Sequence, residues 1–401
     1  MPTNTRHGYA YKSSRTPFGR PQRAQRTNKP KHGQYIDPAK FVKVATPVTA
    51  EEYNPTHQFA DFAVDERIQR NLITKGFVTP TPIQDKTIPL GLEGKDIIGI
   101  ANTGTGKTVA FALPILHKLM NDPRAKALIV APTRELAMQI EEEFRTIGKG
   151  GGFTGAILIG GSPYGPQLRD LRNKPRIIIG TPGRIKDHLN EGTLKLSDCN
   201  IVVLDEVDRM LDMGFVNDVK QLLSELATPR QAFYFSATMD ARVSALIDTF
   251  SPEAVAVSVK QGDTSANVHQ DVIPYSGNGS KIDALHNLLI EPVVSKAIVF
   301  EATQRNVERL EKDLLQRGFK VSAIHGGKTQ GQRKRALDSF KQNHSSILIA
   351  TDVAARGIDV PDVSHVINYG MPQTYDDYTH RIGRAGRAGK IGYALTFVEH
   401  R

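Results

Sequence analysis

The chain has 401 residues, a formal net charge of +10 and a single cysteine, Cys199. This length allows two domains, each with a sizeable core. One cysteine excludes an internal disulfide and is typical of proteins from a reducing compartment. No apolar run reaches the length of a membrane span, and the N-terminus lacks the apolar region of a signal peptide. We therefore expect a soluble cytoplasmic protein with no membrane partner.

The positive charge is concentrated in an N-terminal tail. Residues 1–36 contain eight Lys or Arg and no Asp or Glu, which leaves 44 basic and 42 acidic residues in the body. Residues 1–56 are poor in large apolar side chains, so we predict a disordered basic tail. Such a tail can bind nucleic-acid phosphates, and its scattered aromatic rings can stack on bases. The alternative is an unstructured, solubilising extension.

Residues 57–258 alternate short apolar runs with longer amphipathic segments. Helices are expected to begin near Thr108, Arg134 and Val216. The expected strands are 96–101, 127–131, 155–159, 176–180, 201–205 and 231–236. Alternation of continuous apolar strands with helices predicts a parallel sheet with helices on both faces.

A second block of the same kind follows. Residues 259–278 are polar and contain several glycines, so we predict a linker there, with a second domain over residues 279–401. The expected strands of this domain are 296–300, 320–324, 346–350, 363–368 and 393–398. The two blocks show no sequence repeat, but both predict the same α/β class.

The segment from Ala101 to Thr108 follows the first expected strand and ends in Gly-Lys-Thr, the pattern of a phosphate-binding loop. Its first position is Ala101 where the strict pattern has Gly. The backbone of Gly104, Thr105 and Gly106 would bend so that its N–H groups point at phosphate oxygens. Lys107 would reach the β- and γ-phosphates, and the Thr108 hydroxyl would bind Mg²⁺.

Acidic residues follow the most apolar strand, Ile201–Leu204. Asp205, Glu206 and Asp208 lie at its carboxyl end, where α/β sheets bind ligands. Asp205 would hold Mg²⁺, directly or through water, and Glu206 would orient and deprotonate the attacking water. A solvated cluster of loop acids is the alternative, but it does not explain the buried strand.

The segment from Gly76 to Gln84 has the sequence GFVTPTPIQ. The Gln84 amide offers a donor and an acceptor that match adenine N6 and N7. Phe59, which lies 17 residues before Gly76, could stack on the base. Taken alone, this segment would be a Pro-rich turn.

Together these motifs resemble the DEAD-box family of ATP-dependent RNA helicases, from about Phe59 to Val398. The segment 205–208 reads Asp-Glu-Val-Asp, so Val207 stands where the family name has Ala, and we expect repacking to tolerate it. Glu301 and Ala302 also replace commoner residues. Further matching segments are PTREL at 132–136, Gly160-Gly161, TPGR at 181–184, SAT at 236–238, His325-Gly326, ATDVAARGID at 350–359 and HRIGRAGR at 380–387.

The resemblance implies two RecA-like domains and a role for each matching residue. It implies RNA-backbone contacts from Arg134, Gly161, Thr181, Arg184, Gln330, Arg333 and Thr351. It implies coupling between ATP state and RNA binding through Ser236, Thr238, His380 and Arg381. It implies a ribose contact from Asp359, and it implies that Arg384 and Arg387 are arginine fingers that complete the ATP site when the domains close.

The sequence thus predicts a monomeric ATP-dependent RNA helicase that uses ATP and Mg²⁺ to clamp RNA and to unwind short duplexes locally. An ATP-gated RNA clamp without unwinding shares all of these motifs, so it stays open as an alternative. A passive RNA chaperone that acts through the basic tail is disfavoured by the intact ATP site. A DNA helicase is disfavoured because the matching motifs are those that handle RNA.

Overall fold

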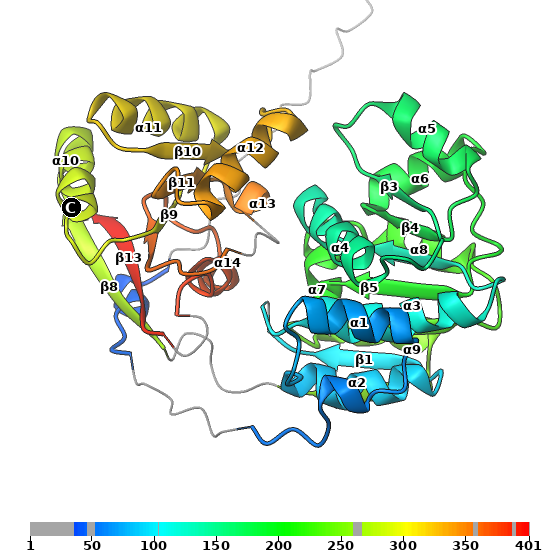
Figure 1. The fold of residues 1–401 in the computed structure, drawn as a ribbon. Helices are drawn as coiled ribbons and strands as arrows, with labels where there is room; N and C mark the ends of the chain where they lie inside the picture. Colours follow the sequence, from blue (N-terminus) through cyan, green and yellow to red (C-terminus); the bar gives the residue numbers. More distant parts are fainter. Residues whose placement is uncertain are drawn as a thin grey trace, which may run out of the picture. The chain divides into compact units, whose positions relative to one another are not determined.

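A computed structural model describes residues 36–45, 53–102, 104–259, 267–355, 360–386 and 390–400. Figure 1 shows two parallel sheets, each covered by helices on both faces. We call the body built on the first sheet domain 1 and the body built on the second sheet domain 2. No helix among the described residues is long and apolar enough to cross a bilayer.

The sheet of domain 1 has seven strands in the order β3-β4-β2-β5-β6-β1-β7, all paired in parallel. The expected strands at Ile201–Asp205 and Gln231–Ser236 are confirmed to the residue. The strands are β1 (Ile97–Ile100), β2 (Ala127–Val130), β3 (Gly155–Leu158), β4 (Ile177–Gly180), β5 (Ile201–Asp205), β6 (Gln231–Ser236) and β7 (Val255–Ser258).

Helices cover both faces of this sheet because its strands are apolar on both sides. In β5, Ile201 and Val203 belong to one core cluster, whereas Val202 and Leu204 belong to the other. The described helices of domain 1 are η2 (Phe59–Asp61), α1 (Glu66–Thr74), α2 (Pro82–Leu92), α3 (Lys107–Asn121), α4 (Arg134–Ile147), α5 (Tyr164–Arg172), α6 (Pro182–Asn190), α7 (Val207–Asp212), α8 (Val216–Ser224) and α9 (Ala241–Phe250).

The sheet of domain 2 has six strands in the order β10-β11-β9-β12-β13-β8, again all parallel. Its strands are β8 (Val268–Tyr275), β9 (Ala297–Phe300), β10 (Val321–Ile324), β11 (Ile347–Ala350), β12 (His365–Asn368) and β13 (Gly392–Glu399). The described helices are η1 (Pro38–Phe41), α10 (Gly277–Leu289), α11 (Gln304–Gln316), α12 (Gln330–Lys341), α13 (Asp352–Ala355) and α14 (Tyr375–Ile382). The predicted fold class, two parallel α/β domains, is confirmed.

Two expectations about domain boundaries are wrong. The predicted linker, 259–278, contains the whole of β8 and the first two residues of α10. This strand has polar residues and Pro274, because it is the edge strand of its sheet and only some of its side chains are buried. The interval therefore lacks the continuous apolar run by which the other strands are recognised.

The second correction concerns the predicted disordered tail, 1–56. Residues 36–45 are part of the described structure: they contain η1, and Phe41 is fully buried in a core cluster of domain 2. Residues 53–56 are also described, and they lie against domain 1. In residues 36–45 only Ile36 and Phe41 belong to the core. Two apolar residues in a polar sequence do not form a recognisable pattern, so the sequence did not predict that this segment is folded. Residues 1–35 lie outside the described part of the chain.

Candidate active site

The loop between β1 and α3 turns sharply because of its glycines. Gly104 and Gly106 have φ angles of 81° and 87°, a region that favours glycine. A Cβ atom on Gly106 would lie 2.3 Å from Nε2 of Gln84, so a larger residue does not fit there. The chain passes from this turn directly into α3, which begins at Lys107. The loop is thus held close against the segment that contains Gln84.

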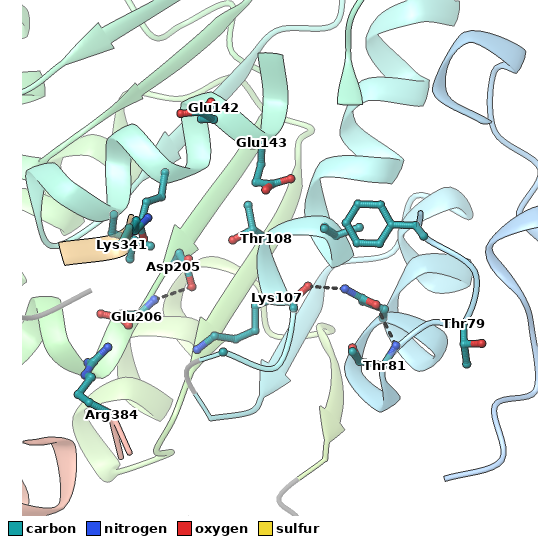
Figure 2. Close-up of a pocket in the computed structure, with 17 residues that line it drawn as sticks. Thr79, Thr81, Lys107, Thr108, Glu142, Glu143, Asp205, Glu206, Lys341 and Arg384 are labelled. Atoms are coloured by element: carbon teal, nitrogen blue, oxygen red, sulfur yellow. Dashed lines mark hydrogen bonds between the residues drawn. The ribbon is translucent and has the colours of Figure 1, made fainter. Parts of the chain in front are cut away.

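Lys107 lies inside this turn with only 6% of its surface exposed. Its Nζ donates a hydrogen bond to the carbonyl oxygen of Ala101, at 3.2 Å. Lys107 and Thr108 line one pocket together with Asp205 and Glu206 (Figure 2). An ammonium group beside the start of a helix is a place where phosphate oxygens bind well. Figure 2 also draws Lys341 and Arg384, which belong to domain 2.

The two carboxylates at the end of β5 are buried at this pocket: Asp205 is 2% exposed and Glu206 is 5% exposed. Oδ1 of Asp205 accepts a hydrogen bond from the backbone N–H of Glu206, at 3.0 Å. Burial raises the pKa of Asp205 to about 6, against the opposite effect of the Lys107 ammonium and with a smaller contribution from the Glu206 charge. A divalent cation at this carboxylate would stabilise its ionised form.

Glu206 has an unusual backbone, with φ 55° and ψ 54°. This left-handed conformation is costly for a residue other than glycine, and such strain is concentrated at functional sites. The side chain is fixed by Arg209, whose Nη1 lies 3.4 Å from Oε2 of Glu206, and both residues are buried. The carboxylate is therefore held in one place at the pocket wall.

Asp208 connects the acidic strand end to the end of β6. Its Oδ2 accepts hydrogen bonds from the backbone N–H of Thr238 at 2.8 Å and from the Thr238 hydroxyl at 2.9 Å. The backbone N–H of Asp208 donates to the Ser236 hydroxyl, at 3.3 Å. Val207, which lies between Glu206 and Asp208 in the sequence, is fully buried in the core. A shift of either strand end would thus be passed to the other.

The Gln84 amide is 3% exposed and holds two parts of the site together. Its Oε1 accepts from the backbone N–H of Thr81 at 2.9 Å, and its Nε2 donates to the carbonyl oxygen of Gly106 at 3.0 Å. Each of these atoms can make one further hydrogen bond, since an amide has two N–H donors and two acceptor lone pairs. One donor and one acceptor remain for a base.

Phe59 does not line the pocket, contrary to the expected base-stacking role. It is 1% exposed and packs in the core beneath Phe77, with ring centroids 5.3 Å apart. Phe77 lines the pocket instead. Phe59 precedes Gln84 by 25 residues and Phe77 precedes it by 7, and only the packing of the folded chain shows which of the two rings faces the pocket.

Asp85 is a residue of this site that sequence reasoning missed. It is buried beside Gln84 and accepts hydrogen bonds from the Tyr53 hydroxyl (2.6 Å) and the backbone N–H of Thr56 (2.8 Å). A ring nitrogen of His57 lies 2.7 Å from Oδ1 of Asp85. Burial, together with Asp85, raises the pKa of Tyr53 to about 12. The carboxylate thereby fixes the start of domain 1 to the segment that contains Gln84.

The residues predicted to bind RNA in domain 1 follow neighbouring strands of its sheet. Arg134 begins α4 after β2, and a Cβ on Gly161 would lie 2.1 Å from Nη1 of Arg134, so the guanidinium lies directly on that glycine. Thr181 caps α6 after β4. Nη1 of Arg184 donates to the carbonyl oxygen of Ser162, at 3.3 Å. The four predicted residues therefore share one edge of the sheet, as parallel strands require.

In domain 2, Arg381 is fully occupied by internal contacts. Its Nε and Nη2 contact the two carboxylate oxygens of Asp352 at 2.6 and 2.7 Å, and its Nη1 donates to the carbonyl oxygen of Gly370 at 2.6 Å. This bidentate pair fixes α14, which also carries His380 and leads to Arg384. Arg381 thus holds the helix in place.

The remaining predicted residues of domain 2 lie on the first turn of α12 and at the end of β11. Gln330 and Arg333 belong to the former, and Thr351 directly follows the latter. Glu301 lies just before α11: its Oε2 accepts from the backbone N–H of Ala302 at 2.8 Å and from Asn306 Nδ2 at 3.2 Å.

Two predicted site residues, Asp359 and Arg387, lie outside the described residues.

Two family models match the chain. The model described as DEAD/DEAH box helicase matches residues 81–246, and the helicase conserved C-terminal domain matches residues 280–389. Among curated proteins, the ATP-dependent RNA helicase CshA of Listeria monocytogenes is 44% identical over 345 residues, which are 86% of this chain and 66% of that protein. CshA of Bacillus subtilis is 43% identical over 348 residues, 86% of this chain and 70% of that protein. The chain thus spans about two thirds of the length of these relatives.

Solved structures are similar over both domains. Dbp5 of S. cerevisiae bound to RNA and ADP BeF3 is 30% identical, with a TM-score of 0.73, and the match covers 86% of this chain and 90% of that one. A DEAD box protein from Methanococcus jannaschii is 39% identical, with a TM-score of 0.51, and the match covers 86% of this chain and 93% of that one.

Proposed function

We propose that this chain, which belongs to the DEAD-box family of ATP-dependent RNA helicases, couples ATP binding and hydrolysis to the clamping of RNA and the local unwinding of short duplexes. The observation that carries the proposal is the grouping of Lys107, Asp205 and Glu206 at one pocket beside Gln84. Family membership supports the RNA substrate, because the relatives named above are RNA helicases. The individual roles below are proposed from the family resemblance together with the geometry of each domain.

The nucleotide binds with its phosphates on the loop before α3. Backbone N–H groups of Gly104, Thr105 and Gly106 and the ammonium group of Lys107 contact the phosphate oxygens. The free donor and acceptor of Gln84 bind the adenine edge. Guanine presents the reverse pattern there, so the site favours ATP over GTP.

Adjacent groups complete the nucleotide site. Phe77 covers the base, and Phe59 supports Phe77 from below. Asp359 contacts the ribose.

The pocket fits Mg²⁺ as a partner of the phosphates. The Asp205 carboxylate is buried there with a raised pKa, and Lys107 is the cation that opposes this shift, so a divalent ion would complete the charge balance. Asp205, directly or through water, and the Thr108 hydroxyl would hold it. When bound, the ion neutralises charge on the transferring phosphoryl group.

Glu206 acts as the general base of hydrolysis. Its strained backbone and its contact with Arg209 hold the carboxylate in one orientation, in which it takes the proton of the attacking water. Arg384 and Arg387 stabilise the charge that develops on the γ-phosphoryl group. The contacts of Asp208 with Ser236 and Thr238 transmit the state of this site toward the RNA-binding edge.

RNA is held through its backbone at the strand ends. Arg134, Gly161, Thr181 and Arg184 provide the surface in domain 1, and Gln330, Arg333 and Thr351 provide the surface in domain 2. His380 and Arg381 take part in coupling, the latter by fixing α14. We further propose that the protein acts as a monomer in the cytoplasm, without a membrane partner, and that the basic residues 1–36 add contacts to RNA phosphates.

The test compares the full chain with its Glu206→Gln variant in two assays. RNA-stimulated ATP hydrolysis should fall by about 10²-fold or more in the variant, because the base is lost while the phosphate contacts remain. ATP-dependent RNA binding should persist in the variant. An unchanged hydrolysis rate would show that the assigned base is wrong.

Displacement of a strand from a short RNA duplex then separates the two modes of action. ATP-dependent displacement by the unmodified chain supports a helicase. ATP-dependent RNA binding without displacement would instead identify an RNA clamp.

A further inference from the structure

Residues 36–44, which precede domain 1 in sequence, are built into domain 2, and we call this segment the strap. Its short helix η1 is capped by Asp37, whose Oδ1 accepts from the backbone N–H of Ala39 at 3.0 Å. Phe41 is fully buried and Ile36 is 8% exposed, and both belong to the core cluster on one face of the second sheet. The strap lies beside β8 and β13 (Figure 1).

The strap also extends the sheet by backbone pairing. The N–H of Lys43 donates to the carbonyl oxygen of Gln270 at 2.9 Å, and the N–H of Gln270 donates to the carbonyl oxygen of Lys43 at 2.8 Å. This antiparallel bridge lies on the free edge of β8. The strap is therefore held by backbone hydrogen bonds at the sheet edge as well as by the apolar packing of Ile36 and Phe41.

The buried side of the strap contacts α14. The ring of Phe41 lies 4.6 Å from the ring of Tyr378, which is itself fully buried. The Tyr378 hydroxyl donates to Oε1 of Gln270 at 2.9 Å, so the residue that pairs with the strap also binds the helix. Nζ of Lys40 lies 6.0 Å from the ring centroid of Tyr375, one turn earlier in α14.

Helix α14 carries His380 and Arg381 and leads to the arginines on which the proposed hydrolysis depends. Tyr378 lies two residues before His380 and three before Arg381, and α14 leads into the turn that contains Arg384. Residues Ile382 and Ala385 of this stretch lie in the same core cluster as Phe41. The position of Arg384 therefore depends on how α14 packs against the core of domain 2.

We infer that the strap positions α14, and that Phe41 is a positioning residue for ATP hydrolysis although it lies outside every nucleotide motif. This inference rests on the proposed function, in which Arg384 and Arg387 act on the γ-phosphoryl group. Phe41 is buried in the core of domain 2 and does not line the pocket that contains Lys107, Asp205 and Glu206. Loss of Phe41 should therefore lower turnover and leave ATP binding unchanged.

The experiment uses the full chain with Phe41→Ala and, as a matched control, Val42→Ala, since Val42 is the next residue and is 53% exposed. We expect RNA-stimulated kcat to fall at least fivefold in Phe41→Ala, with KM for ATP within twofold of the unmodified chain. Val42→Ala should match the unmodified chain in both constants. Phe41→Leu, which restores apolar bulk, should recover at least half of the lost kcat.

Hydrogen exchange over residues 375–382 provides the structural readout. It should accelerate in Phe41→Ala, while exchange over β5 in domain 1 stays unchanged. Were kcat to stay within twofold in a variant whose α14 exchanges faster, the strap would only cover apolar surface, and the inference would be overturned. If Phe41→Ala fails to fold, Phe41→Val, which also removes the ring, and Lys40→Ala replace it in the comparison, and kcat within twofold of the unmodified chain in both would overturn the inference.

Glu206→Gln run in parallel separates this inference from the proposed function. If the unmodified chain hydrolyses ATP with RNA and Glu206→Gln does not, the proposed function stands whatever Phe41→Ala shows. If the unmodified chain has no RNA-stimulated hydrolysis, the proposed function fails first, and exchange in α14 alone then reports whether the strap seats that helix.

Discussion

The first strands of the two sheets end in different ways, although the sheets share one strand order. Numbered along each domain, the order is 3-4-2-5-6-1 in both, with β7 added in domain 1. After β1 the chain makes a glycine turn and presents Lys107 to an open pocket. After β8 the chain also turns at a glycine with positive φ, Gly277, and then reaches Lys281.

The second lysine is enclosed by aromatic rings. Nζ of Lys281 lies 4.7 Å from the ring centroid of Tyr275 and 4.3 Å from that of Tyr369. Burial lowers its pKa, and Glu301 acts in the opposite direction. Domain 1 thus keeps an open pocket beside its lysine, whereas in domain 2 aromatic side chains surround the lysine. Topology brings the strand ends to one edge, and the residues at those ends decide whether a site forms.

The largest expected difference between the two lysines is in ATP hydrolysis. Lys107→Met should lower RNA-stimulated hydrolysis by about 10²-fold or more, because it removes the charge proposed to contact phosphate. Lys281→Met should change hydrolysis by less than about threefold, while it destabilises domain 2 by roughly 1–2 kcal/mol through the lost cation–π contacts. Steady-state kinetics measures the hydrolysis rates, and urea unfolding measures the change in stability. A 10²-fold loss of hydrolysis in Lys281→Met would show that the two lysines do not differ in function as expected.

The two glycine turns give a second, smaller contrast. Gly106→Ala should weaken ATP binding about tenfold or more, since the new Cβ would meet Gln84 and the φ of 87° strains alanine. Gly277→Ala has a similar φ of 76° but nothing within 4 Å of the new Cβ, so only the backbone cost of about 1 kcal/mol remains. Titration with a fluorescent ATP analogue measures binding. Equal losses in the two variants would mean that contact with Gln84 is not what requires glycine.

The smallest expected effect concerns acid stability. Burial lowers the pKa of His365 in β12 to about 4, and its ring stacks on Tyr393 with centroids 4.8 Å apart. The unfolded chain therefore binds a proton near pH 6.5, before the folded domain does. The contribution of His365 to the free energy of unfolding is complete above pH 6.5 and falls as the pH drops from 6.5 to 4. About 2 kcal/mol of it is lost by pH 5, and below pH 4 this contribution changes no further.

This effect can be located by comparison within the molecule. His365→Phe should flatten the pH dependence of hydrogen exchange over β12 between pH 7 and 5. Exchange over β5 in domain 1 should keep its own pH dependence in the variant. If β12 in His365→Phe remains as acid-sensitive as in the unmodified chain, His365 is not the titrating group.

Most of the fold could be predicted from the sequence, because the strands buried on both faces are continuous apolar runs. The edge strand β8 was missed for the opposite reason: with a polar, partly exposed sequence it is not distinguishable from a linker. The nucleotide loop and the acids after β5 could be predicted because their spacing is set by one strand and one turn. Asp85 could not, since its partners are fixed only when residues 53–57 fold back onto α2.

The position of the strap has a consequence for synthesis on the ribosome. Phe41 emerges 337 residues before Tyr378, its partner in the core of domain 2. At about 5–20 residues per second, the strap waits roughly 20 to 70 s for that partner, while the whole of domain 1 is completed. During this interval Ile36 and Phe41 have no apolar surface of their own domain to cover them, so this short segment is where a nascent chain would most readily engage a chaperone or a neighbouring copy.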